Sequence, residues 1–372
     1  MPLDFSQTLV VGISSTALFD LHEAVEVFTT KGIKAYREYM VDREDVPLEP
    51  GTGMPLVRSL LSLNTHCDAN DMPIAEVVVM SLNSPETGAR IAKTIRALGL
   101  PISRFAFTGG EALADYVEGY CVDLFLSTNE ADVQAVVDAG KCAGALLYDP
   151  PEGFEPPENQ VRIAFDADAV LFNEESEVVY QKEGLPAFHA NEDTQQDAIL
   201  PDGSHANLLR KLSRLQERLP QPVEYSPVRL AIVTARNAPA EMRVIKTLRA
   251  WGVYVDAIFF LGGLEKGPIL KALRPHIFFD DQDRHLAVAA TLVPSGRVPY
   301  KKGSGLNPVD ELVERLDTSE VPLSRSPADD PSPTDPSHAT EYIPEGVLEG
   351  VVRSVNKDAT VLGFGPASLE KE

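Results

Sequence analysis

The chain has 372 residues, enough for two or three ordinary domains, and 44% of them are hydrophobic. Its 33 Lys and Arg against 56 Asp and Glu give a formal net charge of −23, which argues against a broad nucleic-acid-binding surface but is compatible with a local site for a small anion. No apolar run approaches the roughly 20 residues that span a bilayer, and the first residues lack a basic segment followed by an apolar one, so we expect a cytoplasmic protein without membrane contacts.

Short apolar runs alternate with amphipathic, helix-length stretches from the start of the chain. Runs that are apolar throughout indicate strands buried on both faces, and the intervening helices indicate parallel pairing. The predicted fold class is therefore α/β, with doubly wound parallel sheets. The predicted strands are residues 8–13, 77–82, 105–108 and 124–127 in the first half, and residues 163–165, 230–234, 258–261 and 277–280 in the second.

The composition divides the chain into three parts. Residues 1–150 and 151–317 each contain one set of predicted strands, so each is expected to be one domain. After about residue 318 the chain is rich in proline among Ser, Asp and Thr, with few aromatic residues. Such a segment buries too little apolar surface to offset the entropy of ordering it, so residues 318–372 are predicted to be a disordered acidic tail.

The two halves are related by an internal repeat. A shift of 153 positions aligns residues 77–113 with residues 230–266 without a gap, and it also carries Phe125 onto Phe278. Doubly wound folds share apolar strands but need not share loop lengths, so we interpret the repeat as an internal duplication. The identical pairs are Arg90 and Arg243, Lys93 and Lys246, Thr94 and Thr247, Arg96 and Arg249, Ala97 and Ala250, Gly99 and Gly252, Phe107 and Phe260, Gly109 and Gly262, and Gly110 and Gly263.

In the second half, two carboxylates follow the first predicted strand. Asp166 and Asp168 are two residues apart at the carboxyl end of that strand, where open α/β sheets bind ligands. Like charges this close repel each other, and the usual remedies are a bound cation or a proton held on one carboxylate. A hard, oxygen-ligated ion such as Mg²⁺ suits the first remedy.

The next three strand ends also carry polar groups. Thr234 and Arg236 follow the second strand, and hydroxyl and guanidinium groups both bind phosphate. Lys266 lies in a turn that leads into a helix, and the fourth strand ends at Asp280 and Asp281. Each signal is weak by itself, since a single Asp pair or turn lysine is usually a solvated surface group. The prediction of a site rests on four strand ends of one sheet presenting these groups together.

The order of these groups resembles the haloacid dehalogenase (HAD) superfamily of phosphohydrolases. A closer resemblance is to the cytosolic 5'-nucleotidase type I family, and it covers nearly all of the chain before the predicted tail. It implies two HAD-like (Rossmannoid) halves, of which the second is catalytic. The strings that carry it are VVGISSTALFD (10–20), FAFTGG (105–110), RIAFDADAVLFNEESE (162–177), VTARN (233–237), TLRAWG (247–252), KGPIL (266–270), RPHIFFDDQ (274–282) and VPY (298–300).

The resemblance implies a catalytic role for four residues. Asp166 is expected to attack phosphorus and form an aspartyl-phosphate, which divides a difficult hydrolysis into two easier steps. Asp168 is expected to protonate the leaving ribose oxygen and later to accept a proton from the attacking water. Thr234 and Lys266 are expected to bind the phosphoryl oxygens and offset their charge.

The resemblance also implies a bound Mg²⁺. Its expected ligands are Asp166, the main-chain carbonyl of Asp168 and the acidic pair Asp280 and Asp281. Within that pair, Asp281 is expected to be the direct ligand and Asp280 its neighbour.

The 65 residues between Asp168 and Thr234 exceed what a crossover needs. The resemblance implies that an insertion at about 175–225 forms a cap, which excludes water and selects the leaving group. Within it, residues 206–219 have apolar residues at helical spacing and are expected to be a packing helix. The aromatic candidates for nucleoside contacts have a core-packing alternative, and Arg236 could instead cap its own strand end. The substrate-binding candidates are Phe172, Asn173, Phe188, Arg236 and Asn237.

The first half lacks the catalytic groups. At the shift of 153 positions, Asp166 corresponds to Ile13, Asp168 to Ser15, Thr234 to Ser81, Lys266 to Leu113, and Asp280 and Asp281 to Ser127 and Thr128. This half is therefore not expected to run the same reaction. Two interpretations stay open: a structural half that packs against the catalytic one, and a regulatory nucleotide site.

The sequence thus predicts an Mg²⁺-dependent 5'-nucleotidase that hydrolyses nucleoside 5'-monophosphates. One alternative is a HAD phosphatase for another small phosphomonoester, such as a sugar phosphate. Another is a non-catalytic nucleotide sensor, against which the complete set of catalytic groups argues. A nucleotide effector and a homo-oligomer are also considered as partners.

Overall fold

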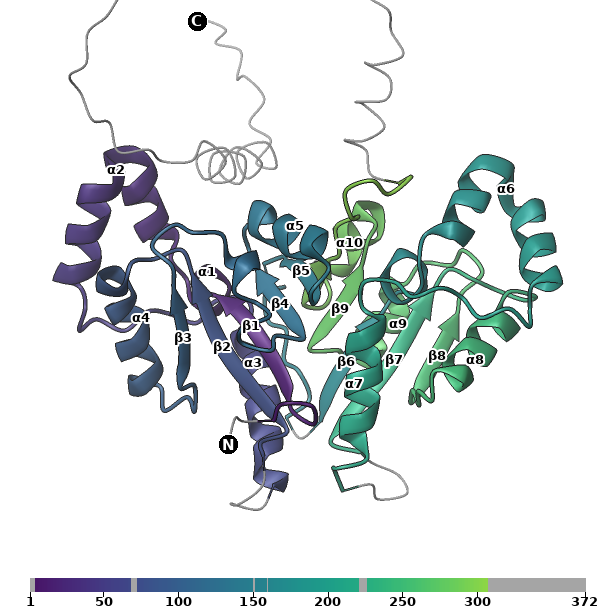
Figure 1. The fold of residues 1–372 in the computed structure, drawn as a ribbon, viewed down its shortest axis with the longest axis horizontal. Helices are drawn as coiled ribbons and strands as arrows, with labels where there is room; N and C mark the ends of the chain where they lie inside the picture. Colours follow the sequence, from purple (N-terminus) through teal and green to yellow (C-terminus); the bar gives the residue numbers. More distant parts are fainter. Residues whose placement is uncertain (1–3, 68–71, 150, 159, 221–225, 307–372) are drawn as a thin grey trace, which may run out of the picture. The chain divides into compact units, whose positions relative to one another are not determined.

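The computed structural model describes residues 4–67, 72–149, 151–158, 160–220 and 226–306, and its first compact unit is Met1–Lys301. Ten strands form one sheet in this part of the chain (Figure 1). None of the helices described there combines the length and apolarity that crossing a membrane requires. The predicted tail, residues 318–372, lies outside the described residues. The strands are β1 (Leu9–Ser14), β2 (Ala75–Ser81), β3 (Arg104–Phe107), β4 (Leu124–Ser127), β5 (Ala143–Leu147), β6 (Val161–Phe165), β7 (Val228–Thr234), β8 (Ala257–Phe260), β9 (Ile277–Asp280) and β10 (Ser295–Arg297).

The α/β class is confirmed, and all eight predicted strands are present. The sequence analysis missed two strands, β5 and β10. The first has the sequence AGALL and the second SGR, so neither shows the run of large apolar residues that indicates a buried strand. Their positions in the sheet, not their own sequences, make them strands.

The strand order is β3-β2-β1-β4-β5-β10-β9-β6-β7-β8, and every pairing is parallel except that of β5 with β10. The two halves therefore form one continuous sheet and not the two parallel sheets expected from the sequence. They join edge to edge at this one antiparallel pair. The pairing of β5 with β10 satisfies backbone N–H and C=O groups that would otherwise be exposed at the edges of two sheets.

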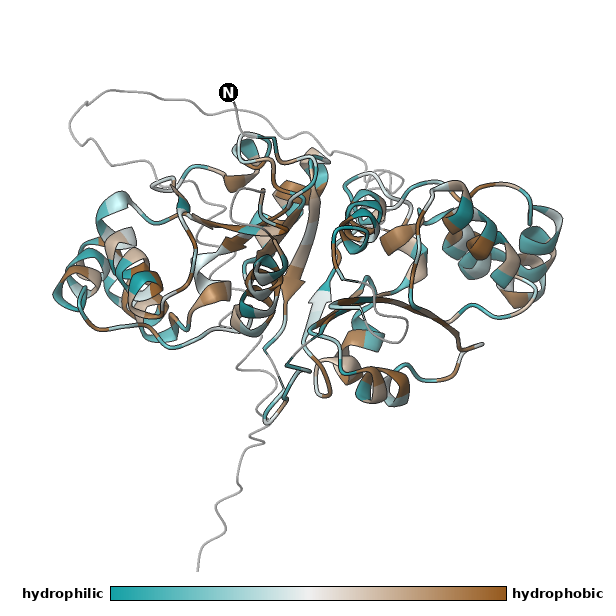
Figure 2. Cartoon of the chain, turned by 90° about the horizontal axis from the view of Figure 1, so that it is seen from below, coloured by the Kyte–Doolittle hydropathy of each residue, from teal (hydrophilic) through white to brown (hydrophobic). Residues whose placement is uncertain are grey.

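Helices cover both faces of the sheet. On one face, α3, α4, α7 and α8 share a single hydrophobic cluster that runs through both halves. On the other face, α5 packs in a cluster within the first half, and α9 and α10 pack in a cluster within the second. Figure 2 shows the apolar strands between these amphipathic helices. The helices are α1 (Ser15–Leu18), α2 (His22–Asp42), α3 (Met54–Ser62), α4 (Pro85–Ala97), α5 (Glu130–Ala139), α6 (Glu175–Thr194), α7 (Ala206–Gln216), α8 (Glu241–Ala250), α9 (Gly267–Leu273) and α10 (Asp283–Ala289), with short turns η1 (Leu63–His66), η2 (Leu113–Asp115) and η3 (Ala167–Leu171).

Elements of the two halves occur at matching positions. The bounds of β2, β3 and β4, moved by 153 positions, coincide with those of β7, β8 and β9. Helix α2, moved by 153 positions, begins where α6 begins and ends one residue beyond it, and the two helices lie at opposite ends of the sheet (Figure 1). Each is bent into a two-armed hairpin by a glycine with positive φ, 79° at Gly32 and 81° at Gly184, a conformation that costs glycine little. The long segment between Asp168 and Thr234 thus has a counterpart of equal length in the first half.

The segment predicted as a cap has two parts. Helix α7 buries four leucines in the shared cluster, which confirms that residues 206–219 contain a packing helix. Helix α6, by contrast, buries only Ser176, Phe188 and Glu192.

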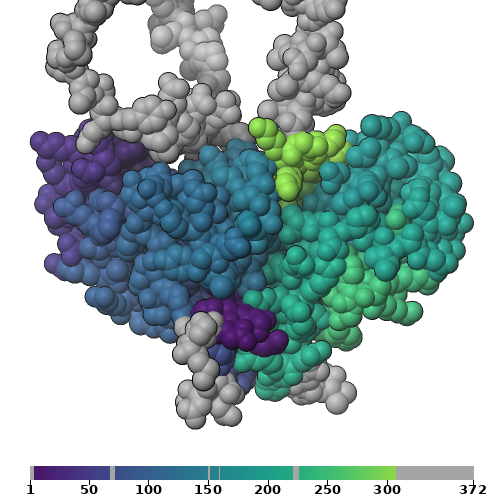
Figure 3. Space-filling view, viewed as in Figure 1, coloured from purple at the N-terminus to yellow at the C-terminus, as the bar shows by residue number. Residues whose placement is uncertain are grey.

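Side chains also hold the two halves together. Lys211 on α7 forms an ion pair with Asp123 of the first half at 2.7 Å. The amide of Gln134 on α5 donates to the main-chain oxygen of Tyr300 at 2.9 Å. Figure 3 shows the second half, in teal and green, packed against the first half, in purple and blue. The first half therefore contacts the segment that carries Tyr300, which bears on the site described next.

Candidate active site

Asp166 lies at the carboxyl end of β6, near the middle of its half of the sheet. Its Oδ1 accepts a hydrogen bond from the main-chain N–H of Ala167 at 2.7 Å, and its own N–H donates to the carbonyl of Phe279 on β9. The chain then turns sharply through Ala169, whose φ of 57° is unusual for a residue other than glycine. The buried carboxylate is thus held at the start of a tight turn between two strand ends.

Lys266 joins two of the predicted acidic residues. Its buried Nζ lies 2.9 Å from Oδ2 of Asp166 and 2.6 Å from Oδ2 of Asp280. Burial alone would lower the pKa of this lysine, but the two carboxylates outweigh it and raise the pKa. The same contact, with His285 nearby, keeps the pKa of Asp280 below its ordinary value although burial opposes this. Lys266 is therefore a fixed positive charge at the centre of the site.

The pKa of Asp166 is shifted in the other direction. Burial raises it to about 6, and the charges of Asp280 and Asp168 add to the rise, while Lys266 opposes it. The repulsion between such closely spaced carboxylates is reduced either by a proton on one of them or by a bound cation. The site thus has more negative charge than Lys266 alone offsets.

Asp281 adds a further buried carboxylate beside Asp166 and Asp280. This residue is buried, and the hydroxyl of Tyr300 donates to its Oδ2 at 2.5 Å. Its Oδ1 is also buried but has no hydrogen-bond partner among the described residues. Burial and the nearby charges of Asp166 and Asp280 raise its pKa well above the ordinary value. A buried carboxylate oxygen without a partner, beside other carboxylates, is the donor that a hard divalent cation prefers.

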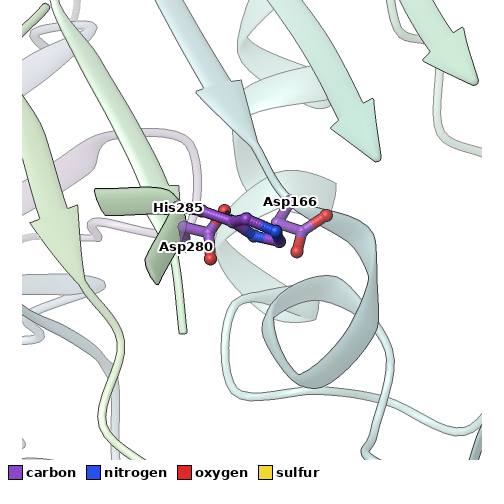
Figure 4. A group of neighbouring side chains, drawn as sticks. All are labelled: Asp166, Asp280 and His285. Atoms are coloured by element: carbon purple, nitrogen blue, oxygen red, sulfur yellow. Dashed lines mark ion pairs between the residues drawn. The ribbon is translucent and has the colours of Figure 1, made fainter. Parts of the chain in front are cut away.

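One ligand atom from each of Asp166, Asp280 and His285 lies within 4.8 Å of the others (Figure 4). His285 is on α10, and its Nδ1 lies 3.4 Å from Oδ2 of Asp280. Asp280 already accepts from Lys266 and from the N–H of Gln282, so both of its oxygens are engaged. By this count of partners, Asp281 has the freer oxygen of the acidic pair.

Asp168 forms its ion pair with Arg236 and not with Lys266. The guanidinium Nε donates to Oδ2 at 2.8 Å, and Nη2 donates to Oδ1 at 2.6 Å, which is a bidentate pair. The third nitrogen, Nη1, donates to Glu192 on α6 at 2.6 Å. Arg236 is thus held by two carboxylates, and contact with a substrate phosphate would require it to release one of them. Thr234 is buried at the end of β7, where its Oγ1 accepts from the N–H of Arg236.

The other substrate-binding candidates are placed differently. Phe172 is fully buried and packs against Trp251, which favours its core-packing alternative. Phe188 is buried within α6, with the guanidinium of Arg236 5.4 Å from its ring centre. Asn237 is hydrogen-bonded to the ring of His189 at 2.8 Å, and Asn173 accepts from the N–H of Glu175. Among the described candidates, Asn237 and Asn173 are the partly exposed ones.

Sequence reasoning assigned no role to three residues of this region. Glu192 lies in a polar stretch of α6 without a motif, and no local signal could have identified it. Tyr300 lies in a string that carried the resemblance, although no role was attached to it. His285 is five residues beyond Asp280, where one turn of α10 places it beside that carboxylate.

The corresponding strand ends of the first half carry neutral groups. The Oγ atoms of Ser15 and Ser81 lie 2.9 Å apart, and the amide of Asn83 donates to Ser81 at 2.8 Å. On the neighbouring strand end, Thr128 donates to Thr16 at 2.7 Å. These hydroxyl and amide groups bond to one another in place of the charged network of the second half.

Comparison with known proteins identifies relatives. A model of the 5'-nucleotidase family matches residues 1–305. Human "Cytosolic 5'-nucleotidase 1B" is 33% identical over 290 residues, which are 76% of this chain and 47% of the human protein. The chain thus spans about half the length of this curated relative. A solved structure of histidinol dehydrogenase from Elizabethkingia anophelis aligns over 80% of this chain and 81% of that one, with 10% identity and a TM-score of 0.20, which is too low to indicate a shared fold.

Proposed function

Because the chain belongs to the 5'-nucleotidase family, we propose that it hydrolyses nucleoside 5'-monophosphates to nucleoside and orthophosphate. The observation that supports this most directly is the buried group of Asp166, Lys266 and Asp281 at adjoining strand ends. It combines a carboxylate nucleophile, a fixed positive charge for phosphoryl oxygens and an unpartnered oxygen for a metal.

The proposed reaction has two steps. A carboxylate oxygen of Asp166 attacks phosphorus, the bond from phosphorus to the ribose oxygen breaks, and Asp168 gives its proton to that oxygen. Water then attacks the aspartyl-phosphate and loses a proton to Asp168, which releases orthophosphate and restores Asp166. Lys266 and the hydroxyl of Thr234 stabilise the phosphoryl oxygens as charge redistributes, because both are fixed before the substrate arrives.

The residues present fit Mg²⁺. We propose that Asp166 and Asp281 bind it through side-chain oxygens and that Asp168 contributes its main-chain carbonyl, while Asp280 acts through Lys266. Bound Mg²⁺ would offset the negative charge of the phosphate and of the crowded carboxylates.

The affinity for Mg²⁺ should increase with pH. Burial raises the pKa of Asp166 to about 6 and that of Asp281 above its ordinary value, so protons compete with the cation for these carboxylates as the pH falls. We expect the dissociation constant to fall by at least about tenfold between pH 5.5 and 7.5, with proton release. Calorimetry in two buffers of different ionisation enthalpy measures both quantities. Asp281→Asn should lose the binding, whereas the exposed control Asp115→Asn should keep it. An affinity that is independent of pH would contradict this assignment.

We also infer that residues 1–150 and 151–317 arose by duplication, with the first domain degenerate and the second catalytic. The matching strand orders and hairpins support this inference. In the second domain, α6 is the part of the span 175–225 that we propose as the cap, since α7 belongs to the core. The human relative is named a cytosolic protein, and we propose the same location here.

Phosphate release from a panel of nucleoside 5'-monophosphates and sugar phosphates, with Mg²⁺ and with EDTA, tests the proposal. We expect release from nucleotides that stops in EDTA. Preference for sugar phosphates would keep the chemistry but reject the substrate. Binding of nucleotides without any release would instead support the sensor. Adding nucleoside di- and triphosphates to the same assay tests for an effector.

A further inference from the structure

Glu192 is a charged residue without any exposed surface, and its partners come from three elements. Its Oε1 accepts from Ser176 on the first arm of α6 and from Nη1 of Arg243 on α8, both at 2.8 Å. Its Oε2 accepts from Nη1 of Arg236, in the loop after β7, at 2.6 Å. Both carboxylate oxygens are therefore bonded, and the side chain is 0% exposed.

These contacts continue to Asp168. Arg236 uses one nitrogen for Glu192 and the other two for Asp168, so the guanidinium is held from both sides. The two arginines, Arg236 and Arg243, balance the charges of the two carboxylates within this buried network. The orientation of Asp168 thus depends on a residue that lies 24 positions away in the sequence, on the second arm of α6.

The first half indicates that the fold itself does not need this network. On the second arm of the hairpin the offset is 152 positions, as the kink glycines Gly32 and Gly184 show, so Glu192 corresponds to Met40. At the shift of 153 positions, Arg236 corresponds to Asn83, Asp168 to Ser15 and Arg243 to Arg90. Arg90 donates through Nε to the carbonyl of Val46 at 3.0 Å, as Arg243 does to that of Ala198, and its Nη1 lies 3.9 Å from the sulfur of Met40, where Nη1 of Arg243 donates to Glu192. The arginine that braces the hairpin is therefore present in both halves. The Glu-Arg-Asp series occurs only in the half with the nucleophile.

We propose that Glu192 is a positioning residue, which fixes Arg236 so that Asp168 faces the leaving oxygen of the substrate. The proposal rests on the proposed function, in which Asp168 protonates that oxygen. In this proposal the second arm of α6 contributes to catalysis. Glu192 does not contact the substrate, but through Arg236 it sets the orientation of Asp168, which does.

Glu192→Gln tests the proposal, because glutamine keeps the shape but removes the charge and replaces one of the two accepting oxygens with a donating NH₂ group. Two substrates are compared: the best nucleotide of the panel, and the same nucleotide with sulfur in place of the bridging 5'-oxygen. The thiolate leaves without protonation. We expect kcat for the oxygen substrate to fall by about 100-fold with KM changed by less than about threefold, since general acid catalysis contributes 10² to 10⁴. The rate for the sulfur substrate should change by less than about threefold.

A control and a second variant complete the experiment. Glu183→Gln, an exposed change on the same helix, should leave both rates unaltered. The double variant Glu192→Met with Arg236→Asn installs the pair that the first half accommodates, Met40 and Asn83, so it should fold even if Glu192→Gln does not. It should show the same selective loss for the oxygen substrate.

The outcomes separate the two claims. Equal losses for both substrates in variants that retain the wild-type melting temperature would overturn the positioning role while leaving the nucleotidase in place. A wild-type protein that releases no phosphate from any nucleotide would overturn the proposed function and this inference together. Losses confined to the oxygen substrate support the proposal.

Discussion

Replacing Asp166 with asparagine is expected to remove phosphate release almost completely, by about 10⁴-fold or more, while the fold is retained. The amide is a poor nucleophile, so the aspartyl-phosphate cannot form. The protein should remain folded because the pKa of Asp166, about 6, is above the ordinary value, so the folded state disfavours its charge at neutral pH. The melting temperature should accordingly be unchanged or slightly higher. Steady-state phosphate release and a thermal melt measure the two effects.

Trapping the intermediate makes this test specific. With substrate labelled at phosphorus, acid quenching should leave label on the wild-type protein in a form that base removes, and none on Asp166→Asn. The exposed control Asp149→Asn should behave as wild type. Phosphate release above about 1% of wild type in Asp166→Asn would contradict nucleophilic attack by this residue and favour direct attack by water.

Replacing Lys266 with methionine is expected to impair both catalysis and stability. The lysine neutralises Asp166 and Asp280 within the buried site, so its loss leaves both carboxylates without their ion-pair partner. Breaking a buried pair from one side costs about 3–5 kcal/mol, and loss of a phosphoryl-binding charge lowers kcat by about 10²–10³-fold. Urea unfolding and phosphate release measure these effects. Lys271→Met, an exposed change on the following helix, is the control.

The stability loss should depend on pH in a defined direction. The contact with Lys266 holds the pKa of Asp280 below its ordinary value of 3.8, so it stabilises the wild type above that pH and is lost as pH falls through the depressed pKa. Without the lysine, the buried carboxylates hold protons more tightly, and acid relieves their repulsion. The deficit relative to wild type should thus be largest near pH 7 and smaller near pH 5. A deficit that grows on acidification would contradict this role of Lys266.

Much of the site could be predicted from the sequence because it depends on where strands end. Asp166, Thr234 and Asp280 each stand at the end of an apolar run, and parallel strands bring such ends to one edge of the sheet. Their approach therefore follows from the strand pattern and the topology it implies. The ion pairs of Lys266 with Asp166 and Asp280 follow from the same arrangement.

The partners of Asp168 could not be predicted in this way. Its contact with Arg236 joins residues 68 positions apart, and that of Arg236 with Glu192 joins residues 44 positions apart. These pairs depend on how the hairpin α6 packs beside the loop after β7, and the polar sequence around Glu192 resembles that of any solvated helix. Phe172, which sequence alone left between core and substrate, is assigned to the core by its contact with Trp251.

The sequence by itself determined the α/β class, eight of the strands, the repeat and the acidic strand ends, because each of these follows from local hydrophobic patterns and from residue types at fixed spacings. Only the tertiary structure decided that the two halves share one sheet, since β5 and β10 are too poor in large apolar residues to signal a strand and are stabilised by pairing with each other. It also decided which carboxylate oxygens are already bonded and which one, Oδ1 of Asp281, has no partner among the described residues. Burial and pairing of charges are properties of the packed chain, in which segments distant in sequence exclude water from the same small volume.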